Sequence, residues 1–254
     1  MGFFDLFRRK NAEVQSAKAQ AVAKPDHVAD VSKMIDPAKD QIFDARPEPD
    51  LSAIPPVAKV PNPIAKKAPT LITLEQLRTG LGITRERADY WDDWLNEAMS
   101  LYQINTKARI AAFLAQVGHE SARLKYTSEL WGPTPTQRRY EGRKDLGNIY
   151  KGDGSRFRGH GLIQTTGRFN HRAVTKRLRA RFPSMGVPDF EAEPQKLTLP
   201  RWAALSAADY WDMKGLNALA DAGKFETITR KINGGLNGFQ DRKNLLASMR
   251  KALG

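Results

Sequence analysis

Apolar residues recur at helical spacing along most of the chain from residue 70 onward. The segment 72–82 offers Thr73 as a helix cap before an apolar periodicity and ends in glycine. The same pattern returns at 88–104, where the apolar positions are Tyr90, Trp91, Trp94, Leu95 and Met99. Both segments are therefore predicted to be amphipathic helices that pack on a common core.

A third helix is predicted within 105–124, where Asn105 or Thr106 can cap and the apolar residues fall at i, i+3, i+4 and i+7: Ile110, Phe113, Leu114 and Val117. At 100° per residue, Glu120 lies roughly 80° from Ile110, at the margin of this stripe. We therefore expect its carboxyl group to be half in the core and half in a cleft. Partial burial disfavours the charged form, which suits a general acid.

Glu120 and its neighbour also have simpler interpretations. A glutamate in a last helical turn can be solvated, or can pair with Arg123 three residues later. His119 can be catalytic, or it can be a hydrogen-bonded support residue. The helix alone does not decide between these alternatives.

The rest of the folded part is also predicted to be mainly helical. The segments 200–223, 225–235 and 244–253 have helical periodicity, and their core candidates are Trp202, Leu205, Tyr210, Trp211, Leu216 and Leu219. The fold class is thus mainly α.

The stretch 126–170 breaks this periodicity and is rich in Gly, Pro, Arg and Tyr. A loop of this length inside a compact domain is usually functional. It holds Glu129 and Glu141, either of which could face Glu120 as the second carboxylate of a glycosidase. Its polar groups suited to sugar hydroxyls are Gln164, Thr166 and Asn170, and its aromatics placed for sugar contact are Tyr126, Trp131, Tyr140 and Tyr150.

Other chemistries lack their motifs. The glycines at 152–161 do not form a GxxxxGK[ST] phosphate loop, His119 and Glu120 are not part of HExxH, and no GxSxG elbow is present. With no cysteine, disulfides and thiolate metal sites are excluded. We expect neither a metal nor an organic cofactor.

Residues 1–70 differ in composition from the remainder. They hold nine of the fifteen prolines and carry a net charge of +2, so +11 of the total +13 belongs to residues 71–254. We predict a disordered arm over 1–45, a Pro-rich linker over 46–69 and a catalytic domain over 70–254. The Phe-rich and basic tip at 1–10 is either a membrane or virion contact or a frayed end.

Three motifs in order, FLAQVGHES, YEGRKDLGN with KGDGSRFRGHGLIQTTGRFNH, and ITRKINGGLNGFQDR, resemble glycoside hydrolase family 19, within the chitinase-like lysozyme superfamily and in particular its phage and prophage endolysins. The resemblance covers about 71–254 and implies a lysozyme-like helical domain with a long irregular substrate-binding loop region. It implies inverting hydrolysis with Glu120 as general acid and Glu141, or alternatively Glu129, as general base. The substrate-binding residues would be His119, Tyr140, Gln164, Thr166, Asn170 and Asn233, with Arg242 supporting the carboxylates.

We expect the substrate to be the glycan strands of peptidoglycan, cut at β-1,4 bonds between amino sugars, since a basic protein suits an anionic polymer. A chitinase and an inactive wall-binding virion protein are the alternatives, and no specific nucleic-acid partner is expected. The start of the chain lacks the order of a secretory signal. We therefore expect a monomeric catalytic domain, made in the bacterial host cytoplasm, that acts on the wall after lysis or from a virion.

Overall fold

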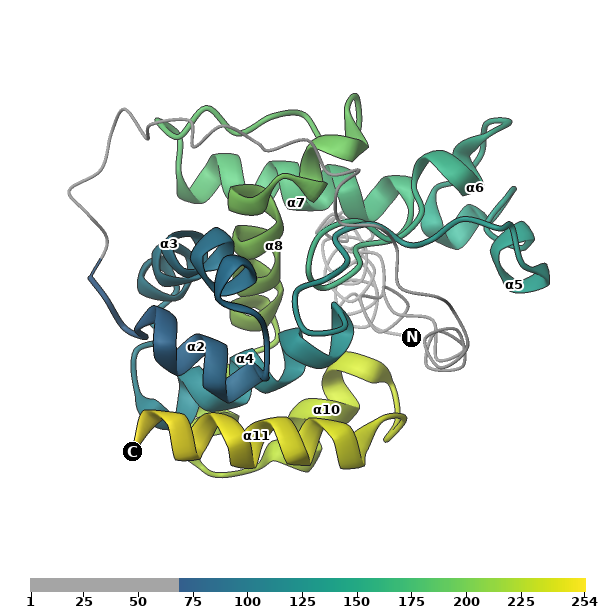
Figure 1. Cartoon of the computed structure of the whole chain (residues 1–254). Coiled ribbons are helices and arrows are strands. Elements are labelled where there is room, and N and C mark those ends of the chain that lie inside the picture. Colours follow the sequence, from purple (N-terminus) through teal and green to yellow (C-terminus); the bar gives the residue numbers. More distant parts are fainter. Residues whose placement is uncertain (1–68) are drawn as a thin grey trace, which may run out of the picture.

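The computed structural model describes residues 69–254, which form a mainly helical domain (Figure 1). The predicted tip at 1–10, the arm at 1–45 and all but the last residue of the linker at 46–69 lie outside the described residues. The elements are α2 (Leu74–Leu81), α3 (Arg85–Leu101), α4 (Lys107–Glu120), α5 (Pro135–Arg138), η4 (Lys144–Leu146), α6 (Asp153–Arg156), α7 (Arg168–Arg181), η5 (Pro194–Thr198), α8 (Pro200–Met213), α9 (Leu216–Asp221), α10 (Phe225–Asn233) and α11 (Phe239–Leu253).

Helices α2 and α4 begin directly after predicted capping residues, whereas α3 begins at Arg85, three residues before the predicted segment, with Thr84 as its cap. Thr73 caps α2 with a complete capping box, and Gly82 ends that helix in a left-handed conformation. The Thr106 side chain accepts a hydrogen bond from the Arg109 amide at the start of α4, so Thr106 rather than Asn105 is the cap. The prediction of a mainly α fold is confirmed, and within residues 69–254 only isolated bridges stand in place of strands.

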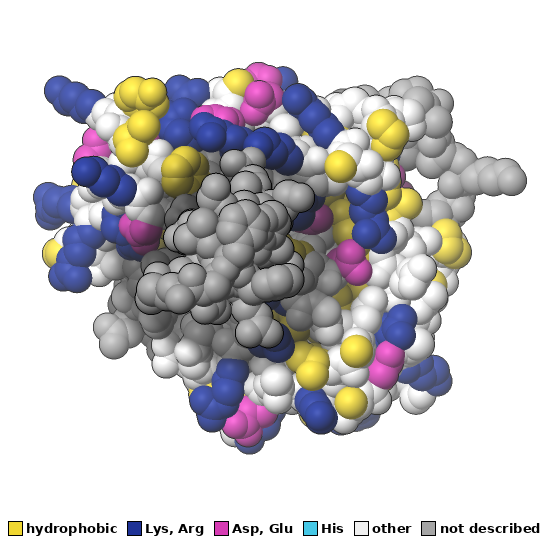
Figure 2. All heavy atoms as spheres, turned by 180° about the vertical axis from the view of Figure 1, so that it is seen from behind, with side chains coloured by type: hydrophobic (Ala, Val, Ile, Leu, Met, Phe, Trp, Pro, Cys, Tyr) yellow, Lys and Arg dark blue, Asp and Glu magenta, His cyan; other side chains and the backbone are white. Residues whose placement is uncertain are grey.

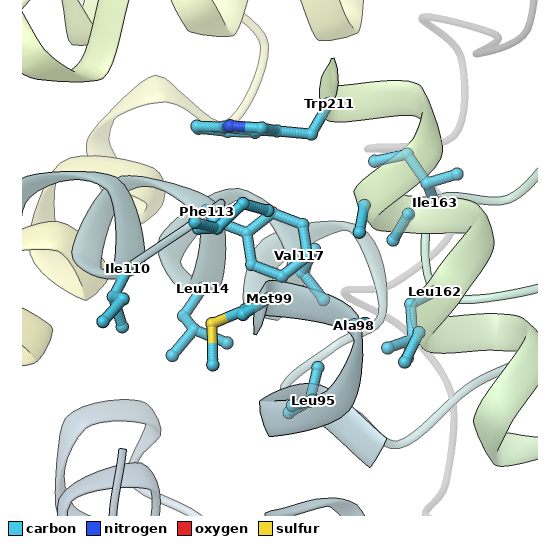
Figure 3. Close-up of a cluster of buried hydrophobic side chains, with 14 of the residues drawn as sticks. Leu95, Ala98, Met99, Ile110, Phe113, Leu114, Val117, Leu162, Ile163 and Trp211 are labelled. Carbon is cyan, nitrogen blue, oxygen red and sulfur yellow. The ribbon is translucent and has the colours of Figure 1, made fainter. Parts of the chain in front are cut away.

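Helix α4 runs through the middle of the domain. It packs against α11, α9 and α2, and α3 packs against α8 and α2. Figure 3 shows the core around it, to which α3, α8 and the loop before α7 contribute side chains. The rings of Phe113 and Trp211 meet edge to face at 5.5 Å in this core. Tyr90, predicted as core, is instead 37% exposed, since it stands at the edge of the buried face of α3.

The region predicted as a long irregular loop contains four helical elements. Helix α5, η4 and α6 form a lobe that projects away from α4 and α11 (Figure 1). The fourth, α7, already begins at Arg168, so Asn170 lies on a helix rather than in the loop. No helix within 69–254 has both the length and the apolar character to span a membrane.

Candidate active site

Glu120 is the last residue of α4 and is buried, with 8% of its surface exposed. The expectation that it stands half in a cleft at the margin of a stripe was therefore wrong. Every residue of α4 from Ile110 to Gly118 is buried, because other elements surround this helix, and His119 beside Glu120 is partly exposed. Instead of Arg123, the partner of Glu120 is Arg242 on α11, whose Nη2 donates to Glu120 Oε1 at 2.6 Å.

Arg242 is fully buried and holds a chain of polar side chains together. Its Nη1 donates to Gln116 Oε1 at 2.5 Å, and Gln116 Nε2 donates to Thr229 Oγ1 at 2.8 Å. Sequence reasoning missed Gln116 and Thr229. Gln116 carried a signal, because a polar residue one turn before Glu120 in an otherwise apolar helix points to the same partner.

The late Asn-Gly-Gly segment joins this network through one carbonyl. Asn233 ends α10, and its Nδ2 donates to the Asn237 carbonyl at 3.2 Å. Arg242 Nε approaches the same oxygen at 3.4 Å. Asn233 is thus brought to the Glu120 network by the loop that precedes α11.

His119 is held by the residue next to Arg242. Its Nδ1 lies 2.7 Å from Asp241 Oδ2, and Arg123 donates to the other oxygen at 3.0 Å. The hydrogen bond with His119 is the main cause that lowers the pKa of Asp241. Gly238 lies against the imidazole: a Cβ there would stand 2.2 Å from His119 Cε1, so only glycine fits. Consecutive residues of α11 therefore fix consecutive residues of α4.

The chain reverses directly after Glu120 through Ala122, Arg123 and Leu124, whose φ angles are 48°, 56° and 62°. Left-handed backbone costs roughly 1–2 kcal/mol per non-glycine residue, so the surroundings must hold this turn. Trp91 Nε1 does so by donating to the Leu124 carbonyl at 3.1 Å. The chain then pairs with the segment before Gln164, with the Glu129 amide donating to the Gly159 carbonyl.

The carboxylate of Glu129 is half-buried and accepts hydrogen bonds from side chains and backbone. Oε1 accepts from Gln137 Nε2 at 3.1 Å and from the Tyr140 hydroxyl at 3.4 Å, and Oε2 accepts from the Gly159 amide at 3.0 Å. Tyr140 itself is buried and lies beside Trp131. The structure thus brings Tyr140 to Glu129.

The carboxylate of Glu141 serves a different site. Its Oε1 accepts from the Gly152 amide at 2.6 Å and its Oε2 from the Gly154 amide at 2.8 Å, at the start of α6. The residue as a whole is exposed. A Cβ on Gly154 would stand 2.8 Å from Oε2, so the glycine allows this close approach. Both oxygens therefore cap a short helix in the projecting lobe.

Gln164, Thr166 and Asn170 are buried, and each donates from its side chain to a nearby backbone carbonyl. Gln164 Nε2 donates to the Gly161 carbonyl, the Thr166 hydroxyl to the Gln164 carbonyl and Asn170 Nδ2 to the Thr166 carbonyl, at 2.8, 3.0 and 2.7 Å. These three predicted sugar-binding residues lie together. Their side-chain hydrogen bonds hold the loop that follows Gly159, the residue whose carbonyl accepts from the Glu129 amide.

Two buried histidines stand beside this loop. His171 Nδ1 lies 2.8 Å from the Gly167 carbonyl, and its Nε2 lies 3.0 Å from His160 Nδ1. Burial lowers the pKa of His171 to about 4. His171 is therefore neutral near pH 7. Its Nδ1 donates a hydrogen bond to the Gly167 carbonyl, and its Nε2 accepts one from His160 Nδ1.

Comparison with known proteins decides the family. No family model matches the chain. A Haemophilus influenzae protein described as a glycosyl hydrolase family 19 domain-containing protein is 32% identical over 170 residues, which cover 56% of this chain and 79% of that protein. The chain belongs to glycosyl hydrolase family 19. The resemblance seen in its motifs is confirmed at the level of the family, and this protein is a glycoside hydrolase of that inverting family.

Solved structures agree on the fold of this family 19 domain. Chitinase C from Streptomyces griseus superposes with a TM-score of 0.58 at 22% identity, covering 73% of this chain and 93% of that structure. A mutant of the same chitinase gives a TM-score of 0.55 at 22% identity, covering 73% and 78%. The helical arrangement is thus that of a family 19 enzyme.

Replacing Arg242 by Met should destabilise this family 19 domain by about 3–5 kcal/mol. The substitution leaves the Glu120 carboxylate buried without its charge partner, and removing one member of a buried pair is costly. The free energy of unfolding, measured in urea by far-ultraviolet circular dichroism, checks this.

Two variants make the test specific. Arg230→Met removes an exposed pair with Glu226 and should change stability by less than about 1 kcal/mol. Adding Glu120→Gln to Arg242→Met should restore part of the loss, since a buried amide costs less than a buried charge. Equal losses in the single and double variants would contradict a paired charge.

Proposed function

We propose that this family 19 enzyme hydrolyses β-1,4 bonds between the amino sugars of peptidoglycan, with Glu120 as general acid. The observation that carries the proposal is the buried Glu120–Arg242 pair at the end of α4. A general acid becomes a carboxylate as it protonates the leaving oxygen, and a guanidinium 2.6 Å away stabilises that product. Arg242 thus stabilises the charge that the transfer leaves. Glu120, which is paired as a carboxylate in the free enzyme, has to take up a proton before each turnover.

The second carboxylate in this proposal is Glu129 rather than Glu141, which the sequence favoured. An inverting enzyme needs a carboxylate that can take a proton from water. Both carboxylates accept hydrogen bonds at both oxygens, but Glu141 binds the backbone of α6 in the projecting lobe, whereas Glu129 lies on the segment that pairs with the loop leading to Gln164. The three hydrogen bonds to Glu129 would hold a base in a fixed orientation while His119, Gln164, Thr166, Asn170 and Asn233 shape the surrounding site.

Charge supports peptidoglycan over chitin as the substrate. Residues 71–254 carry a net charge of +11. Figure 2 shows Lys and Arg side chains (dark blue) around the face seen there, with fewer acidic ones among them. Chitin is uncharged, but peptidoglycan carries carboxylates on its peptides, so only the latter gains from this field. Chitin remains the alternative substrate, since the similar solved structures are of a chitinase.

The biological setting belongs to the same proposal. A basic wall hydrolase whose motifs resemble those of phage and prophage endolysins suits a phage or prophage enzyme made in the host cytoplasm. It would act on the wall at lysis or from a virion. Residues 1–10 would supply any membrane or virion contact, and they lie outside the described residues.

Product analysis tests activity and substrate together. Digests of purified peptidoglycan and of chitin in heavy-oxygen water, followed by mass spectrometry, should show the heavy oxygen at the reducing end of new amino-sugar chains, with peptidoglycan cut faster. Cleavage of chitin alone would refute the substrate assignment. Label in the peptide part, with intact glycan, would refute the glycosidase.

A further inference from the structure

The two most exposed large apolar residues of the described chain are adjacent. Ile149 and Tyr150 are 59% and 62% exposed and lie just before α6 in the projecting lobe. An exposed aromatic ring on a loop is normally mobile, which raises the entropy lost when it binds a partner. The backbone and ring of Tyr150 are instead held in place by two charged residues, Asp153 and Arg168.

Asp153, the first residue of α6, binds the backbone beneath these two residues. Its Oδ2 accepts hydrogen bonds from the amides of Ile149 and Tyr150, at 3.1 and 3.0 Å. Arg168 donates to Asp153 from Nε at 3.1 Å and from Nη2 at 2.6 Å. Burial by itself would raise the pKa of Asp153, but the hydrogen bonds from Arg168 and from the Tyr150 amide together hold it below its usual value.

Arg168 also contacts the Tyr150 ring directly. Its guanidinium lies 5.0 Å from the centre of the Tyr150 ring and 4.5 Å from that of Phe157, within the range of cation–π contacts. Its Nη1 is 3.4 Å from Glu191 Oε1, and its own backbone amide donates to Asn148 Oδ1 at 3.0 Å. Arg168, at the start of α7, thus holds the Tyr150 backbone through Asp153 and contacts the Tyr150 ring directly.

We propose that Arg168 is a positioning residue for glycan binding, which fixes the Tyr150 backbone through Asp153 and the Tyr150 ring through its guanidinium. The inference rests on the proposed function, in which the Tyr150 ring contacts the sugar chain. With Arg168 on one side, the ring presents its exposed surface to a pyranose without first losing rotational freedom. Arg168 itself is mostly covered and acts through Tyr150.

Binding of the full-length protein to insoluble polymer measures this role apart from the chemistry. In a Glu120→Gln background, which prevents turnover, co-sedimentation with purified peptidoglycan and with chitin gives a dissociation constant for each variant. Arg168→Met should weaken binding about 3- to 10-fold, the effect of freeing one or two side chains that must be ordered again. Arg168→Lys should fall between Met and the parent, because Lys keeps the charge but loses the planar fork.

The control and the second variant separate positioning from simple structural support. The control is Arg156→Met. Arg156 also lies over the Phe157 ring and binds the 189–193 segment through the Ala192 carbonyl, but its side chain makes no hydrogen bond or ion pair with Asp153. The Arg156→Met variant should bind like the parent. In a Tyr150→Ala background, Arg168→Met should have almost no further effect on binding.

Three results would overturn the proposal. The first is an equal loss from Arg168→Met with or without the Tyr150 ring, which would indicate a structural role. The second is unchanged binding in Tyr150→Ala, and the third is a parent that binds neither polymer. Because no hydrolysis is measured, a failure of the proposed glycosidase activity would appear in the product analysis and not here.

Discussion

Replacing Glu120 by Gln is expected to lower kcat on peptidoglycan by about 100- to 10,000-fold, the usual contribution of a positioned proton donor. The amide has nearly the size of the carboxyl group and can still accept the hydrogen bond from Arg242 Nη2, so the buried network keeps its geometry. It has no proton to give to the leaving oxygen. The loss should therefore fall on kcat rather than on KM.

Release of soluble reducing ends from purified peptidoglycan measures the loss of activity. Glu226→Gln provides the control, since it changes an exposed glutamate paired with Arg230 and should leave the rate unaltered. Glu120→Gln leaves the buried Arg242 without its counter-charge, so its thermal midpoint should fall below that of the parent, and the rates are compared at a temperature at which circular dichroism shows both proteins folded. A folded Glu120→Gln variant with more than about a tenth of the parental kcat would exclude Glu120 as the general acid.

The helices of this domain were predictable because their signals are local. A cap such as Thr73 or Thr106 acts within one helical turn, and the spacing of apolar residues repeats within two. Both signals can therefore be read from a short stretch of sequence. The short helices α5 and α6 were missed, since four residues are too few to show a period. Helix α7 was missed as well, because six of its fourteen residues are Lys or Arg and its apolar stripe is narrow.

The site was predictable in its residue types but only partly in its contacts. The motif placed Glu120 and Arg242 in one site, and the structure joins them across 122 positions of the chain. Burial of Glu120 was not predictable from its place on a helical wheel, because what surrounds α4 depends on how α2, α9 and α11 fold around it. The capping role of Glu141 depends likewise on amides eleven and thirteen residues away.

The two candidate bases make opposite predictions. If Glu129 activates water, Glu129→Gln should lower kcat by about 100-fold or more, because an amide cannot take a proton from the attacking water. Glu141→Gln should retain most of the rate. It should instead destabilise the protein by roughly 0.5–2 kcal/mol, since both carboxylate oxygens cap the start of α6.

Rate and stability, measured on both variants, separate a base from a cap. Initial rates on peptidoglycan report the chemistry, and urea unfolding reports the stability. The hydrogen bonds that hold Glu129 come from Gln137, Tyr140 and the Gly159 amide. Tyr140→Phe should therefore lower the rate far less than Glu129→Gln, as it removes one orienting contact and leaves the base. A kcat lowered about 100-fold in Glu141→Gln and unchanged in Glu129→Gln would instead make Glu141 the base, with its capping bonds broken when substrate binds.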